Sequence, residues 1–178
     1  AGDGHIYTNK GKYLIGFTGH PTKDFAYFQY LQKLIISEWN KFPQIKIRSN
    51  GVRMVIYSKQ IITKLRLLGF PEGSNKFSKI FIPDIGVNEK VNFVRGLFDT
   101  DGSIFTSNKK GSPNYPSIEL TTGSKQLAFQ VKEFLELQGF KSANIWSHKS
   151  KNSKNIVYKV PLNGWKNVEK WKQLIGFS

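Results

Sequence analysis

The chain has no cysteine among its 178 residues, and this absence excludes several kinds of chemistry at once. Disulfide bonds, cysteine-ligated zinc and thiol catalysis all require a residue that the sequence lacks. No apolar run approaches the roughly 18 residues that a membrane-spanning helix needs, and no signal peptide is visible. We therefore expect an intracellular protein, acting in the cytoplasm or nucleoid or in an organelle.

Acidic residues are also scarce, with 12 Asp and Glu against 27 Lys and Arg. The formal net charge is +15 and the isoelectric point is about 9.9. An excess of this size favours a polyanionic partner, with a generally basic surface as the alternative explanation. Hydrophobic residues make up 39% of the chain and aromatic residues 14%, which is enough for a substantial core. The length allows one domain or two closely packed half-domains.

The segment 93–104, Phe-Val-Arg-Gly-Leu-Phe-Asp-Thr-Asp-Gly-Ser-Ile, is the most informative part of the sequence. It predicts a helix that ends in a carboxylate-rich turn and continues into a strand. Gly96 would leave room for another backbone, and Gly102 would close the helix in a C-terminal turn. Carboxylates at a helix C-terminus are unfavourable because the dipole is negative there. Such an arrangement favours a bound cation, and Mg²⁺ takes one or two carboxylates together with waters and phosphate oxygens.

The beginning of the chain repeats this ending. Residues 1–6 line up with residues 99–104, so that Gly4 corresponds to Gly102, an offset of 102 minus 4, or 98 residues. Later segments correspond as well, because Leu-Leu-Gly-Phe at 67–70 recurs as Leu-Ile-Gly-Phe at 174–177. An internal repeat of this kind predicts two similar units, each with one aspartate at the same structural place.

Hydrophobic periodicity predicts the same order of elements in both halves. The expected strands are 4–9, 12–18, 45–48, 52–56, one from 103, 117–122, 143–148 and 156–162, and the expected helices are 24–39, 58–68, 93–101, 124–138 and 165–175. Residues 71–84 are expected to connect the halves, and residues 108–114 to form a polar loop. The predicted fold class is α+β, with two pseudo-symmetric αββαββα half-domains covering residues 1–85 and 86–178. Antiparallel sheets with helices on one face leave the other face exposed, so we expect a concave DNA-binding saddle.

Segment 93–104 resembles the second signature of the LAGLIDADG homing endonucleases, and Asp3-Gly4 resembles the end of the first signature. The sequence around Gly96 is most similar to the archaeal intron-encoded and intein-associated branch of this family, in its single-chain two-repeat form. The helix that should precede Asp3 is missing from the sequence. We expect a chain that physically begins at Ala1 to be less stable and weakly active.

The resemblance implies a metal site at the ends of the two signature helices. These helices pack on a pseudo-twofold axis, which would bring Asp3 and Asp101 together beneath the scissile phosphates. The expected metal set is Asp3, Asp101 and the residues before them, Gly2 and Thr100. The alternative is two ordinary turn-forming Asp-Gly pairs. The implied cofactor is Mg²⁺, with Mn²⁺ as a substitute and Ca²⁺ binding without supporting cleavage. Asp99 is assigned a structural role.

The predicted DNA-binding residues come from strand alternation and from the repeat. Lys46 and Arg48 alternate with two isoleucines and should face outward, where a β-ribbon reads base edges in the major groove. Arg53 and Lys159 occupy matching places in the fourth strands, where they would stabilise the phosphate or polarise water, with a plain backbone contact as the alternative. The complete predicted set is His5, Lys46, Arg48, Arg53, Ser103, Trp146, His148 and Lys159.

One position departs from the family pattern. Many members carry a glutamine or another polar residue at the end of the second strand, where this chain has Thr18-Gly19 and Thr122-Gly123.

Together these features predict a monomeric, site-specific, Mg²⁺-dependent double-strand DNA endonuclease. The family implies a long asymmetric target, staggered cuts with 3′ overhangs and a role in intron mobility. Divergent halves in one chain suit an asymmetric site better than a homodimer does. An RNA maturase and a non-catalytic DNA-binding protein on the same scaffold are the alternatives.

Overall fold

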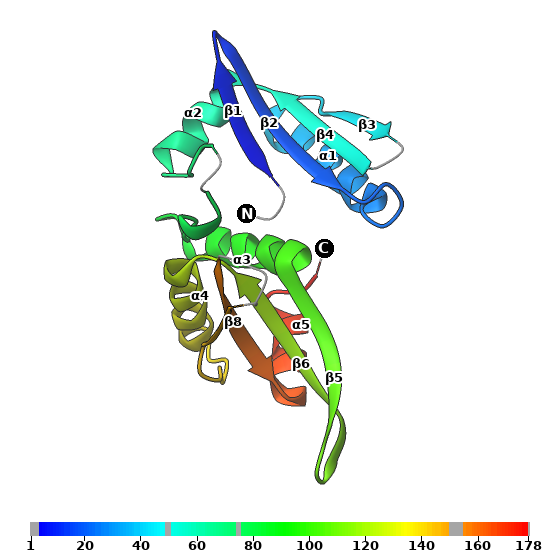
Figure 1. Cartoon of the computed structure of the whole chain (residues 1–178), viewed down its shortest axis with the longest axis vertical. Coiled ribbons are helices and arrows are strands. Elements are labelled where there is room, and N and C mark those ends of the chain that lie inside the picture. Colours follow the sequence, from blue (N-terminus) through cyan, green and yellow to red (C-terminus); the bar gives the residue numbers. More distant parts are fainter. Residues whose placement is uncertain (1–3, 49–50, 74–75, 150–154, 178) are drawn as a thin grey trace. The chain divides into compact units, whose positions relative to one another are not determined.

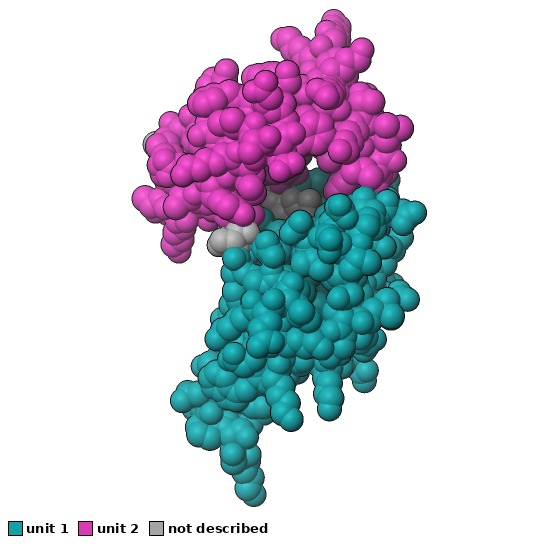
Figure 2. Space-filling model, turned by 180° about the vertical axis from the view of Figure 1, so that it is seen from behind, with its two compact units in different colours: residues 1–2, 76–178 teal, residues 3–75 magenta. Residues whose placement is uncertain are grey.

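The computed structural model describes residues 4–48, 51–73, 76–149 and 155–177 (Figure 1). The chain divides into two compact units, an N-terminal unit within residues 3–75 and a C-terminal unit within residues 76–178 (Figure 2). No helix in the described part of the chain is long and apolar enough to cross a membrane.

The N-terminal unit is a four-stranded antiparallel sheet with helices on one face (Figure 1). Its elements are β1 (His5–Asn9), β2 (Lys12–Gly19), α1 (Phe25–Trp39), β3 (Gln44–Arg48), β4 (Gly51–Tyr57) and α2 (Lys59–Leu67), and the strand order is β1-β2-β4-β3. Lys10 and Gly11 join the first two strands with φ of 42° and 80°, as a tight hairpin turn requires. Ser58 caps α2, since its side chain accepts a hydrogen bond from the Ile61 N–H at 3.2 Å.

The C-terminal unit repeats this order behind an additional helix. Its elements are α3 (Val87–Asp101), β5 (Gly102–Lys109), β6 (Ser112–Thr122), α4 (Lys125–Leu137), β7 (Trp146–Lys149), β8 (Ile156–Asn163) and α5 (Trp165–Leu174), with strand order β5-β6-β8-β7. The core centres on Trp171, which is fully buried and lies 4.3 Å from Phe98 between ring centroids. The predicted αββαββα order is thus present in this unit, and the described residues of the N-terminal unit form all of it except the first helix.

The predicted polar loop at 108–114 is wrong. Strands β5 and β6 extend through this segment and are joined by a two-residue turn at Lys110 and Gly111. Gly111 has a φ of 78°, which a glycine adopts without strain. The polar side chains lie on an exposed hairpin, and exposed strands can be polar on both faces.

The predicted connection at 71–84 is also more structured than expected. A 3-10 turn (Lys76–Ser78) is followed by Ile80 and Ile82, which are both buried in the core of the C-terminal unit. The Ser124 hydroxyl donates to the Ile80 carbonyl at 2.6 Å, and the Gln130 side chain accepts from the Ile82 N–H at 2.9 Å. Residues 76–85 therefore belong with the C-terminal unit, whereas the sequence analysis placed them in the first repeat.

Candidate active site and nucleic-acid interface

Helix α3 presents Asp101 at its C-terminal end. Val94, Leu97 and Phe98 of this helix are buried in the core, and Phe98 packs against Trp171, so the helix is firmly anchored. Asp101 is the last helical residue and is exposed, and β5 begins at the next position. The last carbonyl groups of a helix have no intrahelical partner. The end of α3 therefore places an exposed acidic residue beside helix-terminal backbone carbonyls.

Gly102 is needed at this junction for a different reason from the one predicted. Its φ of −88° and ψ of 160° are extended, so it does not close the helix in a left-handed turn. Instead, an added Cβ would lie 2.3 Å from the carbonyl oxygen of Phe98. The change from helix to strand brings the chain so close to the last helical turn that no side chain fits.

The other predicted metal residues have different positions. The hydroxyl of Thr100 donates to the carbonyls of Gly96 at 3.0 Å and Leu97 at 3.2 Å, so its side chain is used within the helix. Gly2 and Asp3 lie outside the described residues, and the pairing of Asp3 with Asp101 stays a prediction. Asp99 is partly buried.

The donor atoms at the end of α3 fit a hard divalent cation. Within residues 4–48, 51–73, 76–149 and 155–177, no three His, Asp or Glu side chains gather into a metal-binding cluster. Mg²⁺ does not need such a cluster, because it binds through one or two carboxylates together with waters and phosphate oxygens. A site built on Asp101 and backbone carbonyls is of that kind.

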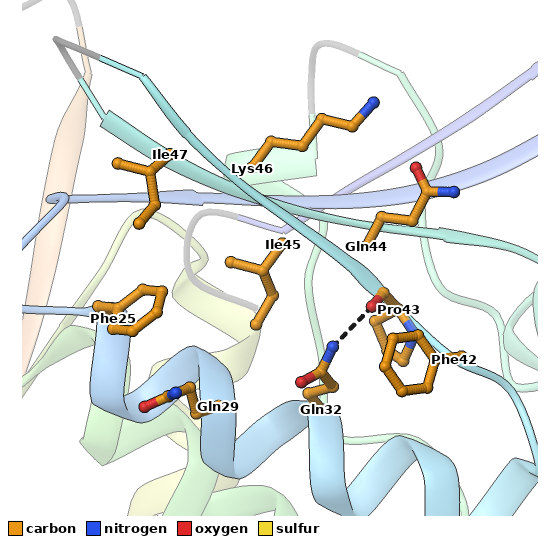
Figure 3. A pocket seen from close by; sticks show the side chains of 9 residues that line it. All are labelled: Phe25, Gln29, Gln32, Phe42, Pro43, Gln44, Ile45, Lys46 and Ile47. Carbon is orange, nitrogen blue, oxygen red and sulfur yellow. Dashed lines mark hydrogen bonds between the residues drawn. The ribbon is translucent and has the colours of Figure 1, made fainter.

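The outward face of the N-terminal sheet carries the predicted basic residues. Lys46 pairs with Arg53, and Arg53 pairs on its other side with Thr18, which puts all three on one face. Figure 3 shows Gln44 and Lys46 projecting from β3 on the side opposite to Ile45 and Ile47, which point toward α1. Arg48 follows two residues later and is exposed.

A pocket of about 490 Å³ lies on the other side of β3 (Figure 3). It is lined mainly by apolar and amide side chains of α1 and of residues 42–47, and Gln32 donates to the Pro43 carbonyl across it at 2.7 Å. The pocket has no carboxylate or histidine among its lining residues, so it contains none of the predicted metal ligands.

The C-terminal sheet has the same pairing with different side chains. Trp146 pairs with Lys159, and Lys159 pairs on its other side with Thr121. His148 is exposed two residues after Trp146. The strand registers therefore make Trp146 the counterpart of Lys46, and Lys159 the counterpart of Arg53.

The two fourth-strand cations have unlike partners. The Lys159 Nζ lies 2.6 Å from the Glu119 Oε1 and 4.7 Å from the centre of the Trp146 ring. The Arg53 Nη2 instead lies 3.4 Å from the His5 Nε2. The Arg53 Nε is buried and has no hydrogen-bond partner in the part of the chain that the structure describes.

Sequence analysis missed Glu119. It pairs with Ser103 of β5, and the Ser103 hydroxyl approaches the Glu119 carbonyl at 3.5 Å. The sequence signal that could have found it is a carboxylate between Ile118 and Leu120, two core residues. Glu119 is only 6% exposed, and an acidic residue that is buried needs a partner. Glu119 is also a polar side chain near the end of the second strand, where the sequence analysis noted only threonine and glycine.

Comparison with solved structures identifies the fold class of this protein. The fold is that of the single-chain homing endonucleases, which are α+β proteins with two antiparallel four-stranded sheets. A variant of I-DmoI in complex with its target DNA has a TM-score of 0.66 at 16% identity, over 98% of this chain and 88% of that chain. I-WcaI bound to its DNA recognition sequence has a TM-score of 0.63 at 20% identity, over 99% of this chain and 77% of that chain.

The family follows from the sequence. A family profile described as LAGLIDADG-like domain matches residues 88–176, which is half of the chain. The chain therefore belongs to the LAGLIDADG family, as the signature at 93–104 indicated. The replication factor C small subunit of Thermococcus kodakarensis is 25% identical over 185 residues. That match covers 99% of this chain but only 18% of the relative, so the chain spans less than a fifth of that protein's length.

Proposed function

We propose that this protein is a site-specific DNA endonuclease that depends on a divalent metal ion. The observation that carries the proposal is Asp101, which ends the signature helix of the family, is exposed, and is followed directly by a strand of the four-stranded sheet. The net charge of +15 provides the attraction for a polyanion. I-DmoI and I-WcaI, which share the fold, have both been captured on their DNA targets, and this supports duplex DNA as the partner.

We assign the metal site to Asp101 and Asp3, together with the preceding residues Thr100 and Gly2. A divalent cation held there would supply an activated water and stabilise the leaving 3′ oxygen. Structures of I-DmoI with Mg, Mn and Ca support the use of a divalent ion. We expect Mg²⁺ to support cleavage, Mn²⁺ to substitute for it, and Ca²⁺ to bind without cleavage.

The remaining residues position the DNA. Arg53 and Lys159 lie at equivalent places on the outward sheet faces, where a cation that is not already paired with a carboxylate can contact a phosphate oxygen. Alternate side chains along the strands can contact base edges, and this is the role that we assign to Lys46, Arg48, Trp146 and His148. His5 begins β1, and Ser103 is the second residue of β5. His5 lies 3.4 Å from Arg53, and Ser103 pairs with Glu119, which is the partner of Lys159.

The two units differ in these side chains, and we propose that the target is correspondingly long and asymmetric. A monomer whose halves have diverged can read two unlike half-sites. Staggered 3′ overhangs and a role in intron mobility complete the proposal. An RNA maturase or a non-catalytic DNA-binding protein would not need Asp101, and its retention favours the nuclease.

The test is cleavage of a plasmid that carries the uninterrupted insertion locus, in buffers containing Mg²⁺, Mn²⁺, Ca²⁺ or EDTA. We expect linear product with Mg²⁺ and Mn²⁺ only, and none with Asp101→Asn. Glu89→Gln is the matched control, because it removes the same charge from the other end of α3. Specific binding of the locus without cleavage in any metal would instead identify a binding protein.

A further inference from the structure

The outward faces of the two sheets carry unequal charge at equivalent positions. In the N-terminal sheet, the third and fourth strands present Lys46, Arg48 and Arg53, and the second strand has Gly16 opposite His5. The equivalent positions of the C-terminal sheet hold Trp146, His148, Lys159 and, opposite Ser103, Glu119. These described positions thus hold three cations and no acidic residue in the N-terminal sheet, and one cation and one acidic residue in the C-terminal sheet.

Lys159 is held in an ion pair at the sheet face, and its side chain is 27% exposed. Its Nζ lies 2.6 Å from the Glu119 carboxylate, and the Glu119 side chain is only 8% exposed. Salt screens a partly buried pair less than an exposed one. If Lys159 turned to a DNA phosphate, Glu119 would remain as a buried carboxylate without its cation, and that state is costly.

The N-terminal unit excludes such a carboxylate by packing. The His5 ring lies against Gly16, where an added Cβ would be 2.4 Å from the His5 Cε1. No larger residue than glycine fits there while His5 keeps its place. In the C-terminal unit the smaller Ser103 stands opposite Glu119 and leaves room for it. At equivalent positions, the N-terminal unit therefore has His5 and Gly16 where the C-terminal unit has Ser103 and Glu119, so strand β2 places no carboxylate beside Arg53.

We propose that the N-terminal sheet supplies the salt-dependent part of DNA affinity, and that Glu119 withholds Lys159 from phosphate. The inference rests on the proposed function, because it assumes that the outward faces meet DNA. The C-terminal sheet then contributes through Trp146 and His148, by stacking and hydrogen bonding, which depend weakly on salt. Glu119 acts through Lys159 and is a positioning residue that does not itself touch DNA.

The salt dependence of DNA binding measures directly how many phosphate contacts each variant makes. Each phosphate contact changes the slope of log K against log salt concentration by about 0.9. Glu119→Gln keeps the shape of the side chain and releases Lys159, so we expect a slope steeper by about 0.9 than that of the wild type. Arg53→Gln should make the slope shallower by about the same amount. The double variant Glu119→Gln/Lys159→Gln removes the pair without net charge and should restore the wild-type slope.

The probe is a fluorescently labelled, mixed-sequence duplex of about 40 base pairs, titrated in EDTA over a range of KCl concentrations. Glu136→Gln is the matched control, because Glu136 also pairs with a lysine, Lys132, but on helix α4. Thermal melts establish that each variant is folded. As a second route, Ser103→His combined with Glu119→Gly rebuilds the arrangement of the N-terminal unit and should steepen the slope as Glu119→Gln does.

The inference is overturned if Glu119→Gln and Glu136→Gln both keep the wild-type slope, or if both steepen it equally. Wild-type protein that binds no duplex at any salt concentration would overturn the proposed function, and this inference with it. The two failures are distinguishable because the first requires measurable binding by the wild type.

Discussion

Replacing Asp101 with asparagine should separate activity from stability. Asp101 ends a 15-residue helix, where its negative charge meets the negative end of the helix dipole. Removing a charge from that position stabilises a helix by about 0.3–1 kcal/mol, which corresponds to a rise in Tm of about 1–4 °C in a protein of this size. The same change removes the proposed metal ligand, and metal ions supply several kcal/mol of transition-state stabilisation. We therefore expect cleavage to fall at least about a thousandfold while Tm rises.

The comparison variant is Glu89→Gln at the other end of the same helix. Glu89 lies in the first turn of α3, where a negative charge is favourable, so the variant should lose about as much stability as Asp101→Asn gains. Its cleavage rate should match that of the wild type. The assays are plasmid cleavage in Mg²⁺ and differential scanning calorimetry. The reasoning fails if Asp101→Asn still cleaves at the wild-type rate, or if it lowers Tm while Glu89→Gln does not.

Three further predictions concern the scaffold. Gly102→Ala should destabilise the protein by about 1–3 kcal/mol in urea unfolding, because its Cβ would lie 2.3 Å from the Phe98 oxygen; an unchanged midpoint would contradict this. Trp171→Ala should cost about 3–5 kcal/mol because Trp171 is fully buried, and a loss below that of Gly102→Ala would be unexpected. The hydrogen bond from Arg66 holds the pKa of Glu72 below its ordinary value near 4.5. A lowered pKa means that ionised Glu72 stabilises the folded state above pH 4.5, and this stabilisation is lost as the pH falls below that value. Glu72→Gln should therefore flatten the dependence of unfolding free energy on pH on the acid side, as measured by unfolding at stepped pH.

Local features of the fold were predictable because they depend on neighbouring residues. The helices expected at 58–68 and 124–138 and the strands expected at 4–9 and 12–18 are all found where the sequence placed them. The polar loop at 108–114 was not, because polar composition does not distinguish a loop from an exposed hairpin. The burial of Ile80 and Ile82 could not be predicted locally, because it depends on the distant core residues that surround them in the C-terminal unit.

The candidate site likewise has one feature that the sequence could predict and one that it could not. The position of Asp101 at the end of a helix could be predicted from the signature alone, because it follows from adjacent residues. The pairing of Glu119 with Lys159 could not, because these residues are 40 positions apart and meet only through the register of β6 with β8.

The sequence by itself determined the two-unit repeat, the family, the signature helix and the excess of positive charge. These properties reside in composition, spacing and local backbone preference. Only the tertiary structure decided which charges are available on the sheets. A cation's partner is set by strand register and by the side chain opposite, so Arg53 beside His5 and Lys159 beside Glu119 differ although they occupy equivalent positions.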